Sequence, residues 1–253
     1  MRFHRYVALG DSFTEGVGDA DPTRPNGWRG WADRVAEVLA TTSPDLGYAN
    51  LAIRGRKLPA IIDEQVDAAV ALEPDLVTIH GGGNDVLRPK VDIDALAERY
   101  DQALTQLAAT GARLVVFTAF DPAGSAIYRP LRGRFALYNE FVRASADRHG
   151  LDVVDFWGLR EYRDWRYWDP DRMHMGPAGH QRMAIEVLDT LGVPHDLAPL
   201  PLADRPAATR AEQRRENLDW MRTMAIPWVH RRLTGRSSGD GLDPKRSTLL
   251  PID

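Results

Sequence analysis

The sequence contains no cysteine, and this absence excludes disulfide bonds, thiolate metal ligands and cysteine nucleophiles together. It has no apolar run long enough to cross a membrane, and Asp11 interrupts the first apolar stretch too early for a signal peptide. An excess of one charge is also lacking, since 36 acidic residues nearly balance 32 basic ones, so composition does not suggest a nucleic-acid partner. These absences predict a cytoplasmic protein that binds no nucleic acid and does not insert stably into a membrane.

Two kinds of ligand motif are also missing. Neither a G-x-G-x-x-G pattern nor a P-loop follows the first apolar run, which argues against a nucleotide or flavin cofactor. His174 and His180, with their neighbouring carboxylates, match no spacing typical of a metal site. We therefore expect neither a cofactor nor a metal, and the sequence does not indicate an oligomeric state.

Short apolar runs alternate with longer amphipathic ones, and a hydrophobic content of 43% over 253 residues is enough for a large core. Five runs have the length and β-branched content of buried strands: His4–Leu9, Tyr48–Ile53, Asp75–His80, Arg113–Phe120 and Leu151–Phe156. Five longer runs have a helical period: Trp28–Ala40, Leu58–Leu72, Ile93–Thr110, Arg134–His149 and Pro177–Leu191. This alternation predicts an α/β fold, a three-layer sandwich in which helices flank a five-stranded, flavodoxin-like parallel sheet.

The composition changes at about residue 194, where prolines begin to interrupt regular structure. Ala211–Ile226 then resumes a helical pattern, and Gly235–Lys245 is polar and rich in glycine. We expect residues 1–193 to form the domain. Residues 194–253 would form a C-terminal extension, with a proline-rich linker, one docked helix and a partly mobile tail.

The loops that follow the predicted strands hold the unusual residues. In an open parallel sheet, ligands bind at the carboxyl ends of the strands. The first of these loops begins Gly10-Asp11-Ser12, directly after an apolar strand, and so presents one serine at that edge. The next three loops read AIRG (52–55), GGGND (81–85) and AFDP (119–122), and the fifth strand leads to an aromatic stretch ending in DPDRMH (169–174).

A reactive serine needs a base within hydrogen-bonding reach. Of the seven histidines, His174 is placed best, because it lies in a loop at the expected edge just before the last helix of the domain. Asp171 precedes it by three residues, a spacing that lets the carboxylate accept from one imidazole nitrogen and leave the other facing outward. Taken alone, the pair is more often a capped turn with an ordinary loop histidine.

Acyl transfer also needs donors for the developing oxyanion. Gly55 follows the second strand and has no side chain to block the approach to its N–H group, and Asn84 follows three glycines after the third strand. Each is a common turn residue when taken singly. Together on adjacent loops of one sheet edge, they could form the oxyanion hole that Ser12 would require.

Two other motifs resemble parts of an esterase but lack the necessary context. Gly235–Gly239 matches the G-x-S-x-G nucleophile elbow, and His80–Gly83 matches an oxyanion motif that accompanies it. No strand leads into Gly235, and the last histidine, His230, comes before it, whereas the elbow serine is followed by its acid and its histidine. We therefore do not assign the nucleophile to this stretch.

Four short blocks resemble the conserved blocks of the SGNH (GDSL-type) hydrolases, in the family's order: Gly10-Asp11-Ser12-Phe13, Asn50-Leu51-Ala52-Ile53-Arg54-Gly55, Gly82-Gly83-Asn84-Asp85 and Asp171-Arg172-Met173-His174. The resemblance covers about residues 3–191 and departs from the family at Phe13, where the family has leucine. It implies a serine hydrolase of carboxylic esters with Ser12 as nucleophile, His174 as base and Asp171 as its orienting acid. It also implies an oxyanion hole made by the backbone N–H groups of Ser12 and Gly55 and the side chain of Asn84.

The resemblance does not select a substrate, since similar enzymes cleave lipid esters, thioesters, acetylated sugars and aryl esters. An aromatic stretch with interspersed arginines precedes Asp171: Trp157, Arg160, Tyr162, Arg163, Trp165, Arg166, Tyr167 and Trp168. It could hold a sugar or an acyl chain with an arginine steering an anionic group, or it could be a packed loop with exposed charges. Tyr128–Arg134 allows the same two interpretations.

Two alternatives concern other functions. The C-terminal tryptophans and arginines could form a membrane or partner surface: Trp220, Trp228 and the arginines at 214, 215, 231 and 232. The same fold also serves non-catalytic ligand-binding or scaffolding proteins. Against that second alternative, all five positions required for catalysis are present.

Overall fold

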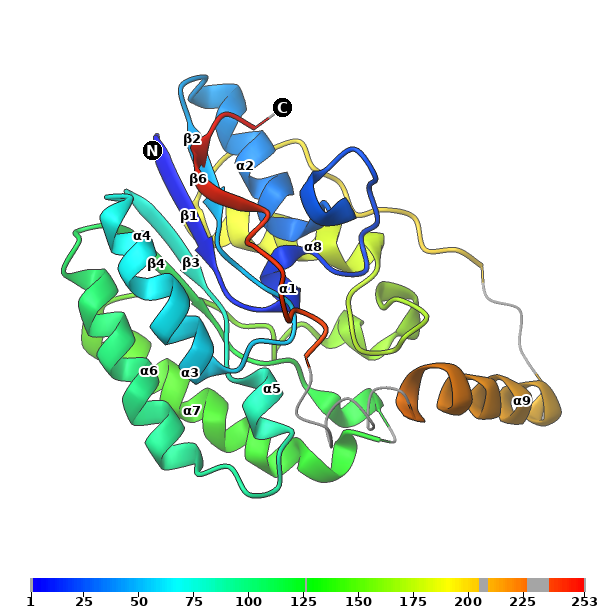
Figure 1. Ribbon diagram of the computed structural model, residues 1–253. Coiled ribbons are helices and arrows are strands. Elements are labelled where there is room, and N and C mark those ends of the chain that lie inside the picture. Colours follow the sequence, from blue (N-terminus) through cyan, green and yellow to red (C-terminus); the bar gives the residue numbers. More distant parts are fainter. Residues whose placement is uncertain (1, 126, 205–208, 227–236, 253) are drawn as a thin grey trace.

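One sheet, covered by helices on both faces, forms the centre of the molecule (Figure 1). The computed structural model describes residues 2–125, 127–204, 209–226 and 237–252. The strands are β1 (Arg5–Leu9), β2 (Gly47–Asn50), β3 (Leu76–Ile79), β4 (Arg113–Phe117), β5 (Asp152–Val154) and β6 (Arg246–Leu250). Their order across the sheet is β5-β4-β3-β1-β2-β6, so β1 is central and its carboxyl end lies between those of β3 and β2.

Longer helices form the outer layers. They are α2 (Gly30–Thr42), α3 (Leu58–Ile61) continued by η2 (Ile62–Val66) and α4 (Asp67–Ala71), α6 (Ile93–Ala108), α7 (Arg132–His149) and α8 (Pro177–Leu191). Two single-turn helices, α1 (Ser12–Glu15) and α5 (Gly83–Val86), follow β1 and β3, and α9 (Arg210–Trp220) with η7 (Met221–Ala225) belongs to the C-terminal region. Short 3-10 turns are η1 (Pro25–Gly27), η3 (Pro122–Gly124), η4 (Arg129–Leu131), η5 (Arg160–Arg163) and η6 (Trp165–Tyr167). Within the described ranges, no helix has both the length and the apolar character needed to span a bilayer.

The two faces of the sheet bury two separate cores because side chains alternate along each strand. On β1, Val7 and Leu9 face the layer of α3, α4, α6 and α7, whereas Tyr6 and Ala8 face α2 and α8. Trp31 of α2 is fully buried in the second core. The central parallel strands β1, β3 and β4 are buried on both faces, as a parallel sheet between two helical layers requires.

The predicted fold class is confirmed, and the order β2-β1-β3-β4-β5 is the flavodoxin-like one. The predicted number of five strands is wrong by one, because β6 pairs antiparallel with β2, with Tyr48 opposite Leu250 and Asn50 opposite Arg246. β6 is short and mostly exposed, so it lacks the apolar signature of a buried strand. Its position depends on a partner that lies about 200 residues earlier, which no local pattern can indicate.

A buried ion pair fixes the chain just before β6. The ammonium of Lys245 lies 2.9 Å from Asp33 Oδ1 on α2, and both side chains are fully buried. The same ammonium donates to the carbonyl oxygens of Trp28 and Arg29, at 3.1 and 2.8 Å, and the hydroxyl of Tyr48 donates to Asp33 at 2.9 Å. Burial raises the pKa of Asp33 and lowers that of Lys245, against their mutual attraction. These contacts hold residues of the C-terminal extension inside the domain.

His180 of α8 is a structural residue that joins α8 to two other segments. Its Nδ1 accepts from the backbone N–H of Trp31 at 3.1 Å, and its Nε2 donates to the carbonyl oxygen of Val17 at 3.1 Å. Both ring nitrogens are therefore engaged by backbone groups, and the ring is neutral. Burial lowers the pKa of His180 from 6.5 to about 4, although the nearby carboxylate of Asp19 opposes this shift.

We predict that His180 makes the protein less stable as the pH falls. His180 takes up a proton near pH 6.5 in the unfolded chain but only near pH 4 in the folded chain. The contribution of neutral His180 to the free energy of unfolding is therefore complete above pH 6.5 and is lost toward pH 4, by roughly 3 kcal/mol in all. His180→Asn removes this titration, so its free energy of unfolding should fall less than that of the wild type between pH 7.5 and 4.5. Chemical denaturation at several pH values measures both, and equal slopes would contradict the assignment.

Candidate active site

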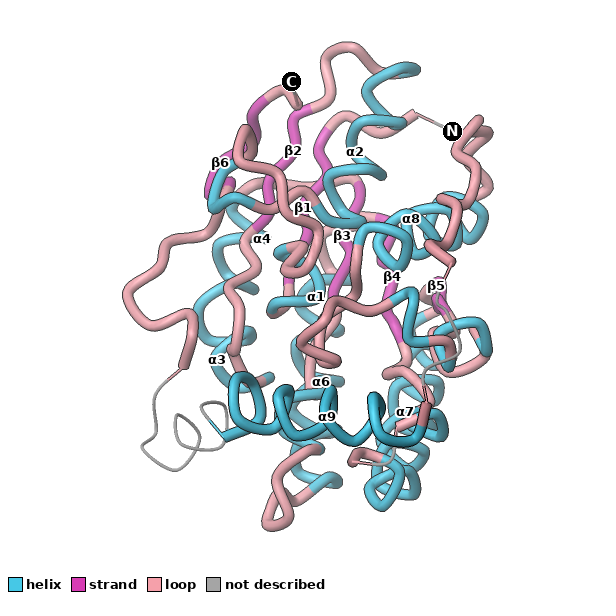
Figure 2. Tube along the Cα trace, turned by 90° about the vertical axis from the view of Figure 1, so that its right-hand side faces the viewer, coloured by secondary structure: helices cyan, strands magenta, loops and turns pink. Residues whose placement is uncertain are grey.

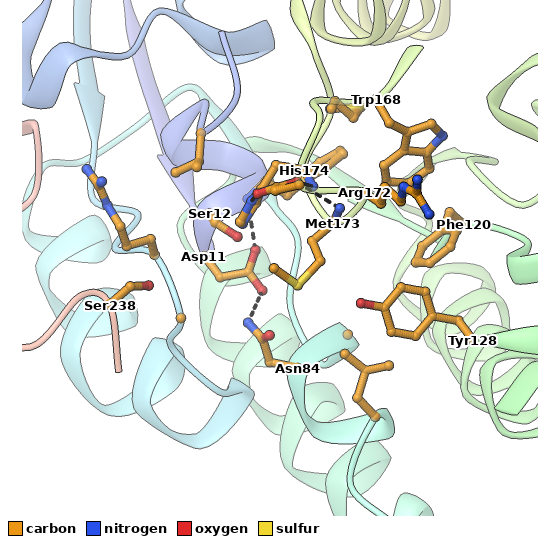
Figure 3. A pocket seen from close by; sticks show the side chains of 18 of the residues that line it. Asp11, Ser12, Asn84, Phe120, Tyr128, Trp168, Arg172, Met173, His174 and Ser238 are labelled. Atoms are coloured by element: carbon orange, nitrogen blue, oxygen red, sulfur yellow. Dashed lines mark hydrogen bonds and ion pairs between the residues drawn. The ribbon is translucent and has the colours of Figure 1, made fainter. Parts of the chain in front are cut away.

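All five residues predicted from the sequence line one cavity of about 600 Å³ at the carboxyl ends of the strands (Figure 3). They come from four loops: Ser12 follows β1, Gly55 follows β2, Asn84 follows β3, and Asp171 and His174 precede α8. In Figure 3, Ser12, His174 and Asn84 lie near one another at the centre, with Asp11 between them. The parallel topology brings these distant segments to one edge.

The turn that presents Ser12 depends on Gly10. This residue has a φ of +150°, and a Cβ there would lie 2.6 Å from Thr14 Oγ1 and 2.7 Å from the carbonyl oxygen of His80. Asp11 then caps α1 by accepting from the N–H of Phe13 at 3.1 Å. Ser12 is the first residue of α1, so its own N–H has no partner within the helix.

Gln65, which the sequence analysis did not single out, holds Gly10 in place. Its Oε1 accepts from the N–H of Gly10 at 2.8 Å, and its Nε2 donates to the carbonyl oxygen of Gly10 at 2.9 Å. Gln65 lies on η2, is only 1% exposed and satisfies both buried backbone groups of Gly10. A glutamine within an amphipathic helix gives no local signal of such a role, because its partner lies 55 residues away.

Asp171 and His174 form a close pair. The Nδ1 of His174 lies 2.5 Å from Oδ2 of Asp171, and Oδ1 of Asp171 accepts from the N–H groups of Met173 and His174 at 2.8 and 2.9 Å. Burial would raise the pKa of Asp171, but the hydrogen bond and charge of His174, together with the two backbone donors, lower it. The carboxylate is therefore ionised at neutral pH and fixes the imidazole so that Nε2 is its remaining nitrogen.

Asn84 is held by two acceptors. Its Nδ2 donates to Oδ2 of Asp11 and to the carbonyl oxygen of Arg56, both at 3.0 Å. Asp11 therefore receives hydrogen bonds from the backbone of the serine turn and from the Asn84 side chain, and it ties the loops after β1 and β3 together. An oxyanion would have to compete with these acceptors for an amide hydrogen of Asn84.

Gly55 has a φ of +75°, which favours glycine, and it lies against the C-terminal extension. A Cβ on Gly55 would meet Ser237 Oγ at 2.2 Å. Ser237 donates to the carbonyl oxygen of Arg54 at 3.4 Å, and both Ser237 and Ser238 line the cavity. The described part of the rejected G-x-S-x-G stretch is thus a wall of the site, not an elbow between strand and helix, whereas Gly235 and Arg236 lie outside the described residues.

An aromatic cluster supports the serine turn and forms one wall. Phe13, the departure from the family leucine, packs against His80 with ring centroids 4.3 Å apart and against Phe156 at 5.6 Å. Trp168 contacts Phe120 at 5.1 Å, and both rings lie on the side of the cavity opposite Ser238 (Figure 3). His80 lines the cavity here, at the end of β3.

The aromatic stretch before Asp171 could bind substrate or could be a packed loop with exposed charges, and the structure shows residues of both kinds. Trp165 and Trp168 line the cavity, whereas Tyr162 is buried and its hydroxyl donates to the carbonyl oxygen of Gly179 at 2.7 Å. Two arginines of the stretch have carboxylate partners, with Arg163 at 2.6 Å from Asp121 and Arg166 at 2.6 Å from Asp164.

Tyr128–Arg134 likewise contains one residue that lines the cavity and others that hold the fold. Tyr128 lines the cavity, Arg132 pairs with Asp121 at 2.7 Å and lies over the ring of Trp157, and Arg134 donates to backbone carbonyls. Arginines 132, 163 and 166 are thus engaged by carboxylates and are not part of the cavity lining, whose basic residues are Arg54, Lys57, Arg88 and Arg172.

Trp220, which the sequence allowed on a membrane or partner surface, contacts the turn that contains Asp171. Its indole N–H donates to the carbonyl oxygen of Asp171 at 2.9 Å. Arg214 and Arg215 are exposed on α9, whereas Trp228, Arg231 and Arg232 lie outside the described residues. Among the residues with described positions, no group of three or more His, Asp or Glu side chains is placed to hold a metal ion.

Comparisons with known proteins identify the family and the fold. Residues 8–182 match the family model described as "GDSL-like Lipase/Acylhydrolase family". No protein with a curated description matches the chain.

Several solved structures share the fold. The α/β hydrolase LAE5 from the metagenome of Lake Arreo has 22% identity and a TM-score of 0.63, over 76% of this chain and 97% of that one. The acetylxylan esterase Axe2 from Geobacillus stearothermophilus has 23% identity and a TM-score of 0.60, over 76% and 95% of the two chains. TesA has 21% identity and a TM-score of 0.60, over 74% and 98%. At these identities, the likeness shows the fold alone.

Gln65→Leu tests the support of the serine turn. The variant leaves the buried N–H of Gly10 without its partner and leaves the carbonyl with only the N–H of Ile53, at 3.3 Å, so we expect the free energy of unfolding to fall by about 2 kcal/mol. The matched control is Gln106→Leu, at an exposed glutamine of α6 that donates to Asp67, where we expect a change of less than about 0.5 kcal/mol. Urea denaturation gives both values, and equal losses would show that Gln65 has no special role.

Proposed function

Because the chain belongs to the GDSL-like lipase/acylhydrolase family, whose model matches residues 8–182, and is a hydrolase of carboxylic esters, we propose that it acts through an acyl-enzyme on Ser12. One observation carries the proposal: His174 is oriented by a hydrogen bond of 2.5 Å to Asp171 in the same cavity that Ser12 lines. A serine, an imidazole and an ionised carboxylate in this arrangement constitute the machinery of acyl transfer.

The proposed reaction has two halves. Ser12 Oγ attacks the ester carbonyl carbon while Nε2 of His174 accepts the hydroxyl proton, and Asp171 stabilises the imidazolium. The tetrahedral intermediate collapses when the C–O bond to the alcohol breaks and His174 returns the proton to the leaving oxygen. Water then attacks the acyl-enzyme with His174 again as base, which releases the acid and restores the serine.

The oxyanion of each intermediate would be bound by the N–H groups of Ser12 and Gly55 and by the amide of Asn84. Supporting this assignment, Asn84 is already oriented by Asp11 and by the carbonyl of Arg56. When the oxyanion forms, one amide hydrogen would turn from these acceptors to the new charge. The change is a reorientation of the side chain and needs no movement of the backbone.

The walls of the cavity favour an apolar acyl or aryl group. Phe120, Tyr128, Trp165 and Trp168 contribute aromatic rings, and the nearby arginines at 132, 163 and 166 are neutralised by carboxylates. Four basic residues also line the cavity, namely Arg54, Lys57, Arg88 and Arg172, of which Arg54 is paired with Glu15 and Arg172 donates to Asn217. The proposal is therefore confined to an apolar acyl or aryl group bound against the aromatic wall.

Ser12→Ala tests the nucleophile. We expect the variant to lose turnover of p-nitrophenyl esters and labelling by a fluorophosphonate, because both need the serine oxygen, while its thermal denaturation stays close to that of the wild type. Wild type and variant are compared on an acyl series from acetate to decanoate. Substantial turnover by the variant would remove Ser12 from this role. Wild-type protein that neither turns over esters nor reacts with the probe would instead favour a non-catalytic ligand-binding protein.

Asn84→Ala tests the oxyanion donor. We expect kcat to fall by roughly a hundredfold or more, with little change in KM, because the lost hydrogen bond strengthens only as charge develops. Gln106→Ala, at an exposed amide side chain on α6 that does not line the cavity, serves as the matched control, with an expected change in kcat of less than about twofold. An unchanged kcat in Asn84→Ala would contradict the assignment.

A further inference from the structure

Helix α9 lies outside the three layers of the domain, on the side of the carboxyl ends of the strands (Figures 1 and 2). Its large apolar side chains are not part of either core, since Leu218, Met221 and Ile226 at the end of the helical segment are 50%, 46% and 58% exposed. A capping box closes its first turn, in which Thr209 and Glu212 exchange hydrogen bonds. Because isolated helices of this length are marginal in water, contacts at the site must help to hold it.

Three contacts join α9 to the turn that contains Asp171 and His174. The indole N–H of Trp220 donates to the carbonyl oxygen of Asp171 at 2.9 Å. The guanidinium of Arg172 lies over the Trp220 ring, 5.1 Å from its centroid, and donates to Oδ1 of Asn217 at 2.7 Å. Arg172 has a φ of +60°, an uncommon conformation for a residue with a side chain, so these contacts stabilise a turn with unfavourable backbone geometry.

The next helical turn reaches the cavity itself. Thr223 and Met224 of η7 line it, together with Ser237 and Ser238 from the segment that follows. The C-terminal extension therefore supplies part of the wall of a site whose reacting groups all belong to the first 182 residues. A volume of about 600 Å³ is that of a pocket for a small molecule.

We propose that α9 and η7 form a cover of the active site that selects its substrates, an inference that rests on the proposed esterase function. Trp220 is a positioning residue: it braces the Asp171–His174 turn through the backbone of Asp171 and the side chain of Arg172. Met224 is a specificity-determining residue that limits the length of the group bound beside it. The substrate class is a compact ester with an apolar acyl or aryl group that enters the cavity, not a polymer lying across an open groove.

Trp220→Phe tests the positioning role, because it removes the indole N–H and keeps a ring beneath Arg172. We expect kcat for p-nitrophenyl butyrate to fall about fivefold with little change in KM, the size expected for one lost hydrogen bond. Hydrogen exchange in the peptide 169–176 should become faster, and the melting temperature should stay within about 2 °C of the wild type. Leu218→Ala is the control on the same helix, and it should change neither exchange nor kcat.

Met224 is tested by a pair of variants of opposite size. In Met224→Ala, we expect the ratio of kcat/KM for p-nitrophenyl octanoate over acetate to rise severalfold, and in Met224→Trp we expect it to fall. The same variants are compared on p-nitrophenyl and naphthyl acetates, in case Met224 lies beside the alcohol. If neither ratio changes in either variant, Met224 does not determine specificity.

Polymeric acetylxylan tests the substrate class. We expect wild-type protein to release acetate from p-nitrophenyl acetate and not measurably from the polymer. If acetate is released from both substrates at comparable rates, the cover does not exclude polymers and the proposed substrate class is wrong.

These results separate failure of the inference from failure of the proposed function. An active wild type whose exchange at 169–176 is unchanged in Trp220→Phe would disprove the bracing role and leave the esterase intact. A wild type without turnover or phosphonate labelling would disprove the esterase, and the selectivity of the cover would be rejected with it. Hydrogen exchange would then still decide whether α9 braces the turn, since it needs no substrate.

Discussion

The close packing around Gly10 is the constraint on which the site depends. β1 is a central strand of the sheet, and Gly10 follows it directly. The backbone at Gly10 passes so close to the side chain of Thr14 and the carbonyl of His80 that no Cβ fits there. Gln65, on η2 in one of the two helical layers, hydrogen-bonds both the N–H and the carbonyl of Gly10. These contacts determine where Ser12 emerges at the sheet edge. The other site residues can act on a substrate only if they are correctly placed relative to Ser12.

A second requirement is that polar groups in the site orient one another. Asp11 accepts from the N–H of Phe13 and from Asn84, so a single carboxylate links the serine turn to the proposed oxyanion donor. Asp171 accepts from two backbone N–H groups and the imidazole of His174. In each case the carboxylate is fully engaged, which is how a charged group near an apolar cavity avoids the penalty of burial without partners. The aromatic walls and the oriented polar groups are therefore compatible.

The sequence predicted the fold class, the order of the five parallel strands and the set of residues that meet in the cavity. These features have local signatures: apolar runs of strand length, glycines where the backbone turns sharply, and polar residues directly after strands. The sequence did not reveal Gln65, β6 or the position of Ser237, because each depends on a partner between 55 and about 200 residues away. A polar side chain that satisfies a distant backbone group looks, in the sequence, like any other polar side chain.

The C-terminal extension shows why a family match leaves the substrate open. The matched region ends at residue 182 and contains every group that would react, and such groups recur on this fold with many substrates. The wall supplied by Thr223, Met224, Ser237 and Ser238 lies beyond it. That wall is held at both ends, by Trp220 on the Asp171 turn and by the buried pair of Lys245 with Asp33. Selectivity can therefore change through the extension while the reacting groups stay where the sheet places them.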